Sequence, residues 1–134
     1  MLQWLSAIPI LASILLIAKL VASWADLPDR VAVHFGIDGQ PNSWASKYTL
    51  GIIVGLVAVG FMVSLAILNQ FTKAPGPLMV ITITSVVATT ALWQAIDFNI
   101  SGKPLRIGII LVPLVLLLAL SFFFVFSTPH TPKP

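Results

Sequence analysis

Four apolar runs, each long enough to cross a lipid bilayer, take up most of the 134 residues of this chain. They read approximately Leu5–Trp24, Leu50–Leu68, Leu78–Ile96 and Ile107–Phe126. An α-helix rises about 1.5 Å per residue, so ~20 residues cover the ~30 Å hydrocarbon core. The runs are continuous rather than alternating, and a backbone in hydrocarbon must satisfy its own hydrogen bonds, which favours helices. We therefore expect an all-α membrane protein with four transmembrane helices in a single domain over residues 1–126.

The composition supports this expectation and excludes several classes of protein. Hydrophobic residues make up 58% and charged residues 8% of the chain, against roughly 25% charged in a soluble domain. The seven basic residues are scattered at the edges of the apolar runs, where cations meet lipid headgroups, so we expect the lipid bilayer as a partner and no nucleic acid. The chain has no cysteine, which excludes disulfides, thiolate metal sites and a cysteine nucleophile.

The first run has features of both a retained span and a cleaved signal peptide. Ser23-Trp24-Ala25 is a tolerable cleavage pattern, but no basic residue precedes Lys19, whereas signal peptides begin with a basic region. Trp4 and Trp24 would lie at the two membrane interfaces of a retained helix. We expect the span to be retained, with Lys19 reaching toward the nearer interface.

Short connections join the later runs. Thr72 to Pro77 contains two prolines and a glycine, which predicts a tight break and antiparallel neighbours. Asp97 to Arg106 contains a second turn at Ser101-Gly102-Lys103-Pro104. The proline-rich tail, residues 127–134, is expected to be disordered.

Small and hydroxylated residues within the runs suggest how the helices pack. Gly51 and Gly55 form a flat strip that suits close packing inside the chain or, alternatively, a homo-oligomer contact. Thr82, Ser85 and Thr89 share one face and are expected to hydrogen-bond to their own turn or to a neighbouring helix. A substrate-lining role for that face is the alternative.

The most informative stretch is the long patterned loop between the first and second helices, residues 25–48. Val31, Val33 and Phe35 alternate with smaller or polar residues, which is the period of a short strand with one apolar face. Asp38-Gly39 is typical of a turn. Asn42 or Ser43 is a plausible N-cap, so we expect the second helix to begin near Trp44. Phe35 and Trp44 are expected to pack onto the helix ends.

The same loop carries a family resemblance, on residues whose spacing is specific: Leu27, Pro28, Asp29, His34, Phe35, Gly39, Pro41, Trp44, Ser46 and Lys47. With the two flanking spans, it resembles a bacterial membrane domain of unknown function that also forms the N-terminal part of Sdp-type immunity proteins. The resemblance implies a helical membrane protein that protects the producing cell from its own toxin and takes part in signalling. The immunity proteins are longer and have more spans, so their second half has no counterpart among these four runs.

Catalytic and metal chemistry find little support in the sequence. His34 with Asp26, Asp29 and Asp38 offers a single imidazole and no familiar ligand spacing, so we expect no metal and no other cofactor. There is no serine or cysteine motif with a histidine base and no pair of carboxylates within a span, so we expect no catalytic residue and no enzyme. His34 is expected to fix the shape of the loop; sensing pH or contacting a ligand is the alternative.

Three functions remain open. The first is a receptor-like or immunity-like protein in which loop 25–48 binds a peptide toxin or another membrane protein, or serves as a structural element. The second is a small transporter, which needs a buried carboxylate; the chain has no glutamate, and Asp97, the one acid outside the loop, stands at a span end where capping or pairing is expected. The third is an accessory subunit of a membrane complex.

The localisation expected is the cell membrane, with several spans and both termini on one side. Loops one and three hold four basic residues and the opposite side two, which mildly favours a cytoplasmic patterned loop. The resemblance to immunity proteins favours an extracytoplasmic loop, and this is the orientation that we expect.

Overall fold

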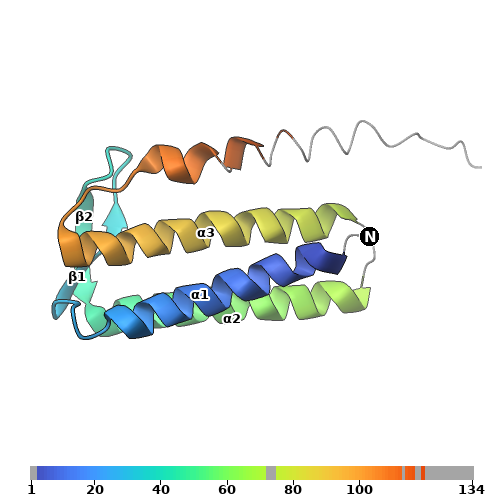
Figure 1. Ribbon diagram of the computed structural model, residues 1–134, viewed down its shortest axis with the longest axis horizontal. Coiled ribbons are helices and arrows are strands. Elements are labelled where there is room, and N and C mark those ends of the chain that lie inside the picture. The colour runs from blue at the N-terminus through green and yellow to red at the C-terminus, as the bar shows by residue number, and fades with distance from the viewer. Residues whose placement is uncertain (1–2, 72–74, 113, 117–118, 120–134) are drawn as a thin grey trace, which may run out of the picture.

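The computed structural model describes residues 3–71, 75–112, 114–116 and 119, and most of them are helical. Three long helices lie side by side and run in alternating directions, and the segment after the third returns alongside it (Figure 1). The described helices are η1 (Gln3–Ser6, a 3-10 turn), α1 (Ala7–Ser23), α2 (Lys47–Phe71) and α3 (Pro75–Ser101). Residues 107–112 and 114–116 are also helical.

Two of these helices, α2 and α3, are long and apolar enough to cross a membrane. The helix α1 has 17 residues and directly follows η1, so the helical segment formed by the two together begins at residue 3. The fourth expected run, Ile107–Phe126, lies only partly within the described residues, and the tail 127–134 lies outside them.

The ends of α3 differ from the expected connections. Pro75, Gly76 and Pro77, expected to break the chain, form the first turn of the helix. Proline is tolerated there because the first N–H groups of a helix have no intrahelical acceptor. At the other end α3 continues to Ser101, and Gly102 then takes a left-handed conformation with φ 69°. Its N–H donates to the Phe98 carbonyl at 2.7 Å, which is a glycine C-cap.

The patterned loop folds into a β-hairpin: the short strand expected at Val31 to Phe35 is confirmed, but it pairs with a second strand, so the fold is not all-α over this segment. Strand β1 (Arg30–Phe35) pairs antiparallel with β2 (Pro41–Ser46). The predicted turn is confirmed: Gly39 has φ 76°, and the Asp38 side chain accepts from the Gln40 N–H at 3.1 Å. The strict alternation expected along β1 is not observed: Val31 and Ala32 are both buried, and register shifts follow between Ala32 and Phe35.

The start of the second helix was placed too early by the sequence. Asn42, Ser43 and Trp44 lie in β2, and α2 begins at Lys47. The cap is Ser46, whose hydroxyl accepts from the Thr49 N–H at 3.3 Å and bonds the Thr49 hydroxyl at 3.1 Å. A serine at the N-cap accepts from a backbone N–H of the first turn that has no acceptor within the helix.

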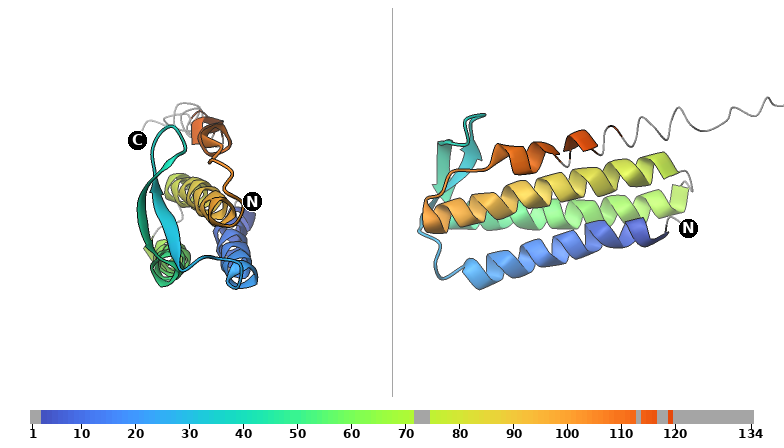
Figure 2. Two further views of the ribbon diagram at one scale, coloured as in Figure 1. Left: turned by 90° about the vertical axis from the view of Figure 1, so that its left-hand side faces the viewer. Right: turned by 45° about the horizontal axis from the view of Figure 1, so that its top comes forward.

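The hairpin lies across one end of the helix bundle, with its strands nearly perpendicular to the helices (Figure 2). The buried core is at this end and joins α1, β1, α2 and α3, through Leu16, Leu20, Leu27, Val31, Leu50, Val54 and Ile96. Burial of Leu27 and Val31 removes their apolar surface from water, and this attaches the hairpin to α1, α2 and α3.

The hydroxyl groups of this face bond mainly within their own helix, and one of them also reaches a neighbouring element, which are the two arrangements expected. The Thr82 hydroxyl is placed to donate to the Leu78 carbonyl at 2.9 Å in its own turn and to the Leu5 carbonyl of η1 at 3.3 Å. The buried Ser85 donates to the Thr82 carbonyl at 2.8 Å. Of the two expected packing glycines, Gly51 faces the Trp24 ring inside the chain, whereas a side chain added at Gly55 would meet no atom within 4 Å.

The tip of the hairpin provides a test of the fold. We expect Gly39→Ala to lower the free energy of unfolding by about 2–4 kcal/mol, because alanine adds a left-handed penalty and overpacks the site. Its Cβ would come within 2.6 Å of the Leu105 carbonyl oxygen. Gly102→Ala is the matched control, since Gly102 also has a positive φ but has no neighbour within 4 Å. Thermal unfolding of the two purified variants should show the larger loss for Gly39→Ala; equal losses would contradict packing of the tip on Leu105.

Candidate functional site

The hairpin is attached to α3 by one side-chain amide. The Asn99 side-chain oxygen accepts from the Ala32 N–H at 2.6 Å, and its nitrogen lies 3.0 Å from the Ala32 carbonyl and 2.8 Å from the Ala95 carbonyl. Ala32 is fully buried, so its backbone groups have no access to water. Asn99 therefore satisfies both backbone groups of a buried strand residue, much as a neighbouring strand would.

Two further contacts hold the far half of the hairpin. The Phe35 ring packs edge-on against Phe98 of α3 with ring centroids 5.2 Å apart. At the tip, the Leu105 N–H donates to the Gly39 carbonyl at 3.4 Å. The expected anchoring role of Phe35 is confirmed, and the hairpin tip lies against the segment that follows α3.

The base of the hairpin is closed where it meets α2. The Lys47 N–H donates to the Asp29 carbonyl at 3.0 Å, and the Lys47 ammonium lies 3.7 Å from the Asp29 carboxylate. The same ammonium lies 5.6 Å from the centre of the Trp24 ring. The Asp29 carboxylate is almost fully exposed, so the ion pair itself contributes little. The backbone bond and the contact with Trp24 fix this corner.

The outer surface of the hairpin carries the remaining motif residues. His34 is exposed and bonds the Asn42 side chain across the strands. The Trp44 side chain is 49% exposed, so it is not the buried anchor that was expected. Pro28 is exposed, and Pro41 pairs opposite Phe35. Within the described residues, no group of three His, Cys, Asp or Glu side chains could hold a metal ion.

The two edges of the hairpin differ in their hydrogen bonding. Ala32 and Trp44 are directly opposite each other in the ladder. Opposed residues of an antiparallel pair either exchange both backbone bonds or direct both outward. Ala32 directs its N–H and carbonyl outward to Asn99, so Trp44 directs its own groups to the outer edge of β2. No described residue bonds to them there.

A second feature is a cleft of about 760 Å³ between α1, the last turns of α3 and residues 103–109. Its polar lining includes Lys19, Asp26, Gln94, Asp97, Lys103 and Arg106, and Trp93, Ile100 and Ile109 add apolar surface. Sequence reasoning did not find this cleft, because its residues come from three separated segments. Thr89 of the hydroxylated face also lines it, whereas Thr82 and Ser85 do not.

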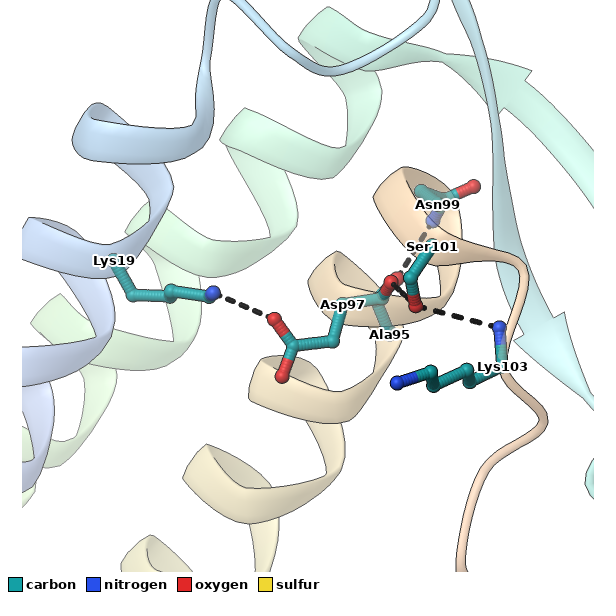
Figure 3. A network of polar contacts seen from close by, with 6 residues as sticks. All are labelled: Lys19, Ala95, Asp97, Asn99, Ser101 and Lys103. Atoms are coloured by element: carbon teal, nitrogen blue, oxygen red, sulfur yellow. Dashed lines mark hydrogen bonds and ion pairs between the residues drawn. The ribbon is translucent and has the colours of Figure 1, made fainter.

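One ion pair crosses the cleft between α1 and α3 (Figure 3). The Lys19 ammonium lies 2.5 Å from the Asp97 carboxylate and 5.2 Å from the centre of the Trp93 ring. The expected pairing of Asp97 is confirmed, although its partner is Lys19 rather than a residue near it in the sequence. Figure 3 also shows Lys103 pointing from the segment after α3 back toward α3.

Comparison with known proteins gives one match. A family model described as a domain of unknown function (DUF1648) matches residues 10–66, which is less than half of the chain. The matched part covers most of α1, the whole hairpin and most of α2. A search of the curated proteins and a search of the solved structures each returned no match. The residues of the cleft that belong to α3 and the following segment lie outside the matched part.

Asn99 is the residue on which attachment of the hairpin can be tested. We expect Asn99→Ala to lower the free energy of unfolding by about 2–4 kcal/mol, because two buried backbone groups of Ala32 lose their partners. Hydrogen exchange of the Ala32 amide should accelerate accordingly. Asn42→Ala is the control, since Asn42 is exposed and its side chain bonds His34 alone among the described residues, and we expect it to cost less than about 1 kcal/mol. Equal effects in calorimetry and exchange would show that Asn99 does not hold the hairpin.

Proposed function

We propose that this chain is a non-enzymatic, multi-pass protein of a bacterial cell membrane, and that its hairpin recognises a peptide or protein partner. The membrane placement is supported by apolar surface that no described element covers. In the most apolar 18-residue stretch of each helix, only 22% of the stretch in α2 and 28% of the stretch in α3 is buried. On α1, Leu11, Leu15 and Val21 are exposed as well. In water, apolar surface of this extent would aggregate, whereas lipid tails would cover it.

In this proposal, the hairpin indicates where the membrane surface lies along the helices. An open sheet edge leaves backbone groups unpaired, which hydrocarbon does not tolerate. The hairpin and the ion pair of Lys47 with Asp29 therefore belong at the polar surface. From there, η1 and α1 together are long enough to return across about 30 Å of hydrocarbon. Residues 107–126 would supply the fourth span.

The observation that carries the recognition role is the free outer edge of β2. Its Trp44 N–H and carbonyl are directed outward without a partner among the described residues, while Asn99 covers the opposite edge. An extended peptide can add to such an edge by main-chain hydrogen bonds, with side-chain contacts providing specificity. Trp44 and Ile37, which is 94% exposed, offer apolar contacts beside it.

The resemblance to Sdp-type immunity proteins favours a peptide toxin or another membrane protein as the occupant of this edge. In that role the chain would protect the producing cell or signal that a toxin is bound. The resemblance also favours an extracytoplasmic hairpin, where a secreted peptide would meet it. A homo-oligomer contact at Gly55 is compatible with this arrangement, because the space beside Gly55 is open.

The transporter and accessory-subunit alternatives have less support. Proton-coupled transport needs a carboxylate that is free to exchange protons. Asp97 is the one acid outside the hairpin loop, and Lys19 already binds it. A purely structural subunit would not need the unpaired edge of β2.

The recognition role can be tested with proline at position 44. Trp44→Pro removes the outward N–H without disturbing the ladder between the strands, because that N–H does not take part in it. Trp44→Ala removes the side chain and retains the N–H. We expect a photo-crosslinker placed at Ser43 to capture a defined peptide or protein in the native host. The yield should fall at least about tenfold in Trp44→Pro and less in Trp44→Ala, as main-chain bonding requires. Equal yields in the two variants would reject strand addition.

The orientation can be tested with a single cysteine, since the chain has none of its own. Gln40 is exposed beside the turn of the hairpin, so we expect Gln40→Cys to react with a membrane-impermeant reagent on intact cells. Labelling only after lysis would place the hairpin in the cytoplasm. Resistance of the protein to extraction at alkaline pH, measured in the same preparation, checks membrane integration independently of orientation.

A further inference from the structure

The cleft between α1, α3 and residues 103–109 has more positive than negative charge available to a ligand. Lys19 and Asp97 neutralise each other across it. Lys103 and Arg106 line the cleft with exposed side chains, and neither charged group has a partner among the described residues. Asp26 is the one other carboxylate in the lining. Two free cations therefore face one free carboxylate.

The floor of the cleft holds a further hydrogen-bond donor. The Gln94 side-chain oxygen accepts from the Arg106 N–H at 2.6 Å, which fixes the orientation of its amide group. The amide nitrogen is then a buried donor with no acceptor among the described residues. A donor in this state is costly, so an acceptor brought within its reach by a small movement of the side chain would be favourable. Together with the side chains of Lys103 and Arg106, it gives the cleft three donor groups that have no acceptor among the described residues.

The apolar part of the lining indicates what kind of anion would fit. Trp93, Ile100 and Ile109 are exposed large hydrophobic residues beside the charged ones. The apolar surface continues from Ile109 along the next helical segment through Val112 and Val115, which are also exposed. A ligand with an anionic group in the cleft and an apolar part along this surface would therefore fit. The volume of the cleft lies in the range of small-molecule sites.

We propose that this cleft binds a phosphate group, and that the phosphate belongs to the headgroup of an anionic phospholipid whose acyl chains lie against Ile109, Val112 and Val115. The inference rests on the proposed membrane placement, in which the hairpin end of the bundle stands at the headgroup level. Arg106 and Lys103 bind the phosphate oxygens, because guanidinium and ammonium groups form strong charge-assisted bonds to phosphate. Basic pockets between transmembrane helices recognise phospholipid headgroups by the same chemistry.

The test uses the purified full chain and native mass spectrometry with titrated lipid. We expect phosphatidylglycerol to bind at least about fivefold more tightly than phosphatidylcholine of the same acyl chains, since each nearby basic residue contributes about that factor. Arg106→Gln and Lys103→Gln should each weaken phosphatidylglycerol binding about fivefold for the same reason. Unchanged thermal unfolding of the lipid-free variants shows that they remain folded.

Arg30→Gln is the matched control, because Arg30 is also an exposed arginine at the hairpin end and does not line the cleft. We expect it to change binding by less than about twofold, as for a surface charge outside the site. An equal loss in Arg30→Gln, or equal binding of the two lipids, overturns the inference.

A competition arm identifies the source of the phosphate. If millimolar glycerol 3-phosphate does not displace the lipid, the phospholipid assignment is supported. If it displaces the lipid and Arg106→Gln weakens this displacement, the cleft binds a soluble organophosphate and the lipid assignment is overturned. If the protein is membrane-integrated and shows no lipid preference, this inference fails while the proposed membrane placement stands.

Discussion

The bidentate contact between the Asn99 amide and the backbone of Ala32 is the interaction on which the arrangement of this molecule depends. A two-stranded hairpin is marginal by itself, and here it lies across the end of a helix bundle with part of its backbone buried. Burial of Val31 and Leu27 favours that position, but it would leave the backbone N–H and carbonyl of Ala32 without hydrogen-bond partners. Asn99 provides those partners from α3, so apolar burial and hydrogen bonding no longer oppose each other. One edge of the hairpin is thereby covered and the other is left open.

Much of this architecture could be predicted from the sequence, because it depends on local pattern. The long apolar runs predicted α1, α2 and α3, and Asp38-Gly39 predicted the turn, which is a local property of backbone conformation. The errors came where two local patterns competed. Asn42 and Ser43 are good helix caps and were assigned as such, but pairing with β1 placed them in a strand and left the cap to Ser46. Pro75 and Pro77 predict a break between helices, but the first turn of a helix accepts both.

The candidate sites could not be predicted, because they are made of contacts between distant segments. Asn99 and Ala32 are 67 residues apart. The sequence around an asparagine near the end of an apolar run does not indicate which distant backbone groups its side chain will bond. The same is true of Lys19 and Asp97, which the sequence assigned separately to a membrane interface and to a helix end. Trp44 is expected from the sequence to pack against the helix ends, together with Phe35. Its place on the outward side of β2 follows from the register of the hairpin, which sequence pattern did not specify.

The hairpin and the cleft are structurally connected through the segment that follows α3. The Leu105 N–H bonds the Gly39 carbonyl at the hairpin tip, and the next N–H, of Arg106, bonds the Gln94 side chain on α3. These two bonds set where residues 103–106 run, and therefore where their two basic side chains line the cleft. A hairpin detached from α3 would release Leu105 and remove one of the two constraints on those residues. Occupation of the cleft and the position of the hairpin are thus linked by geometry, since both depend on the same stretch of backbone.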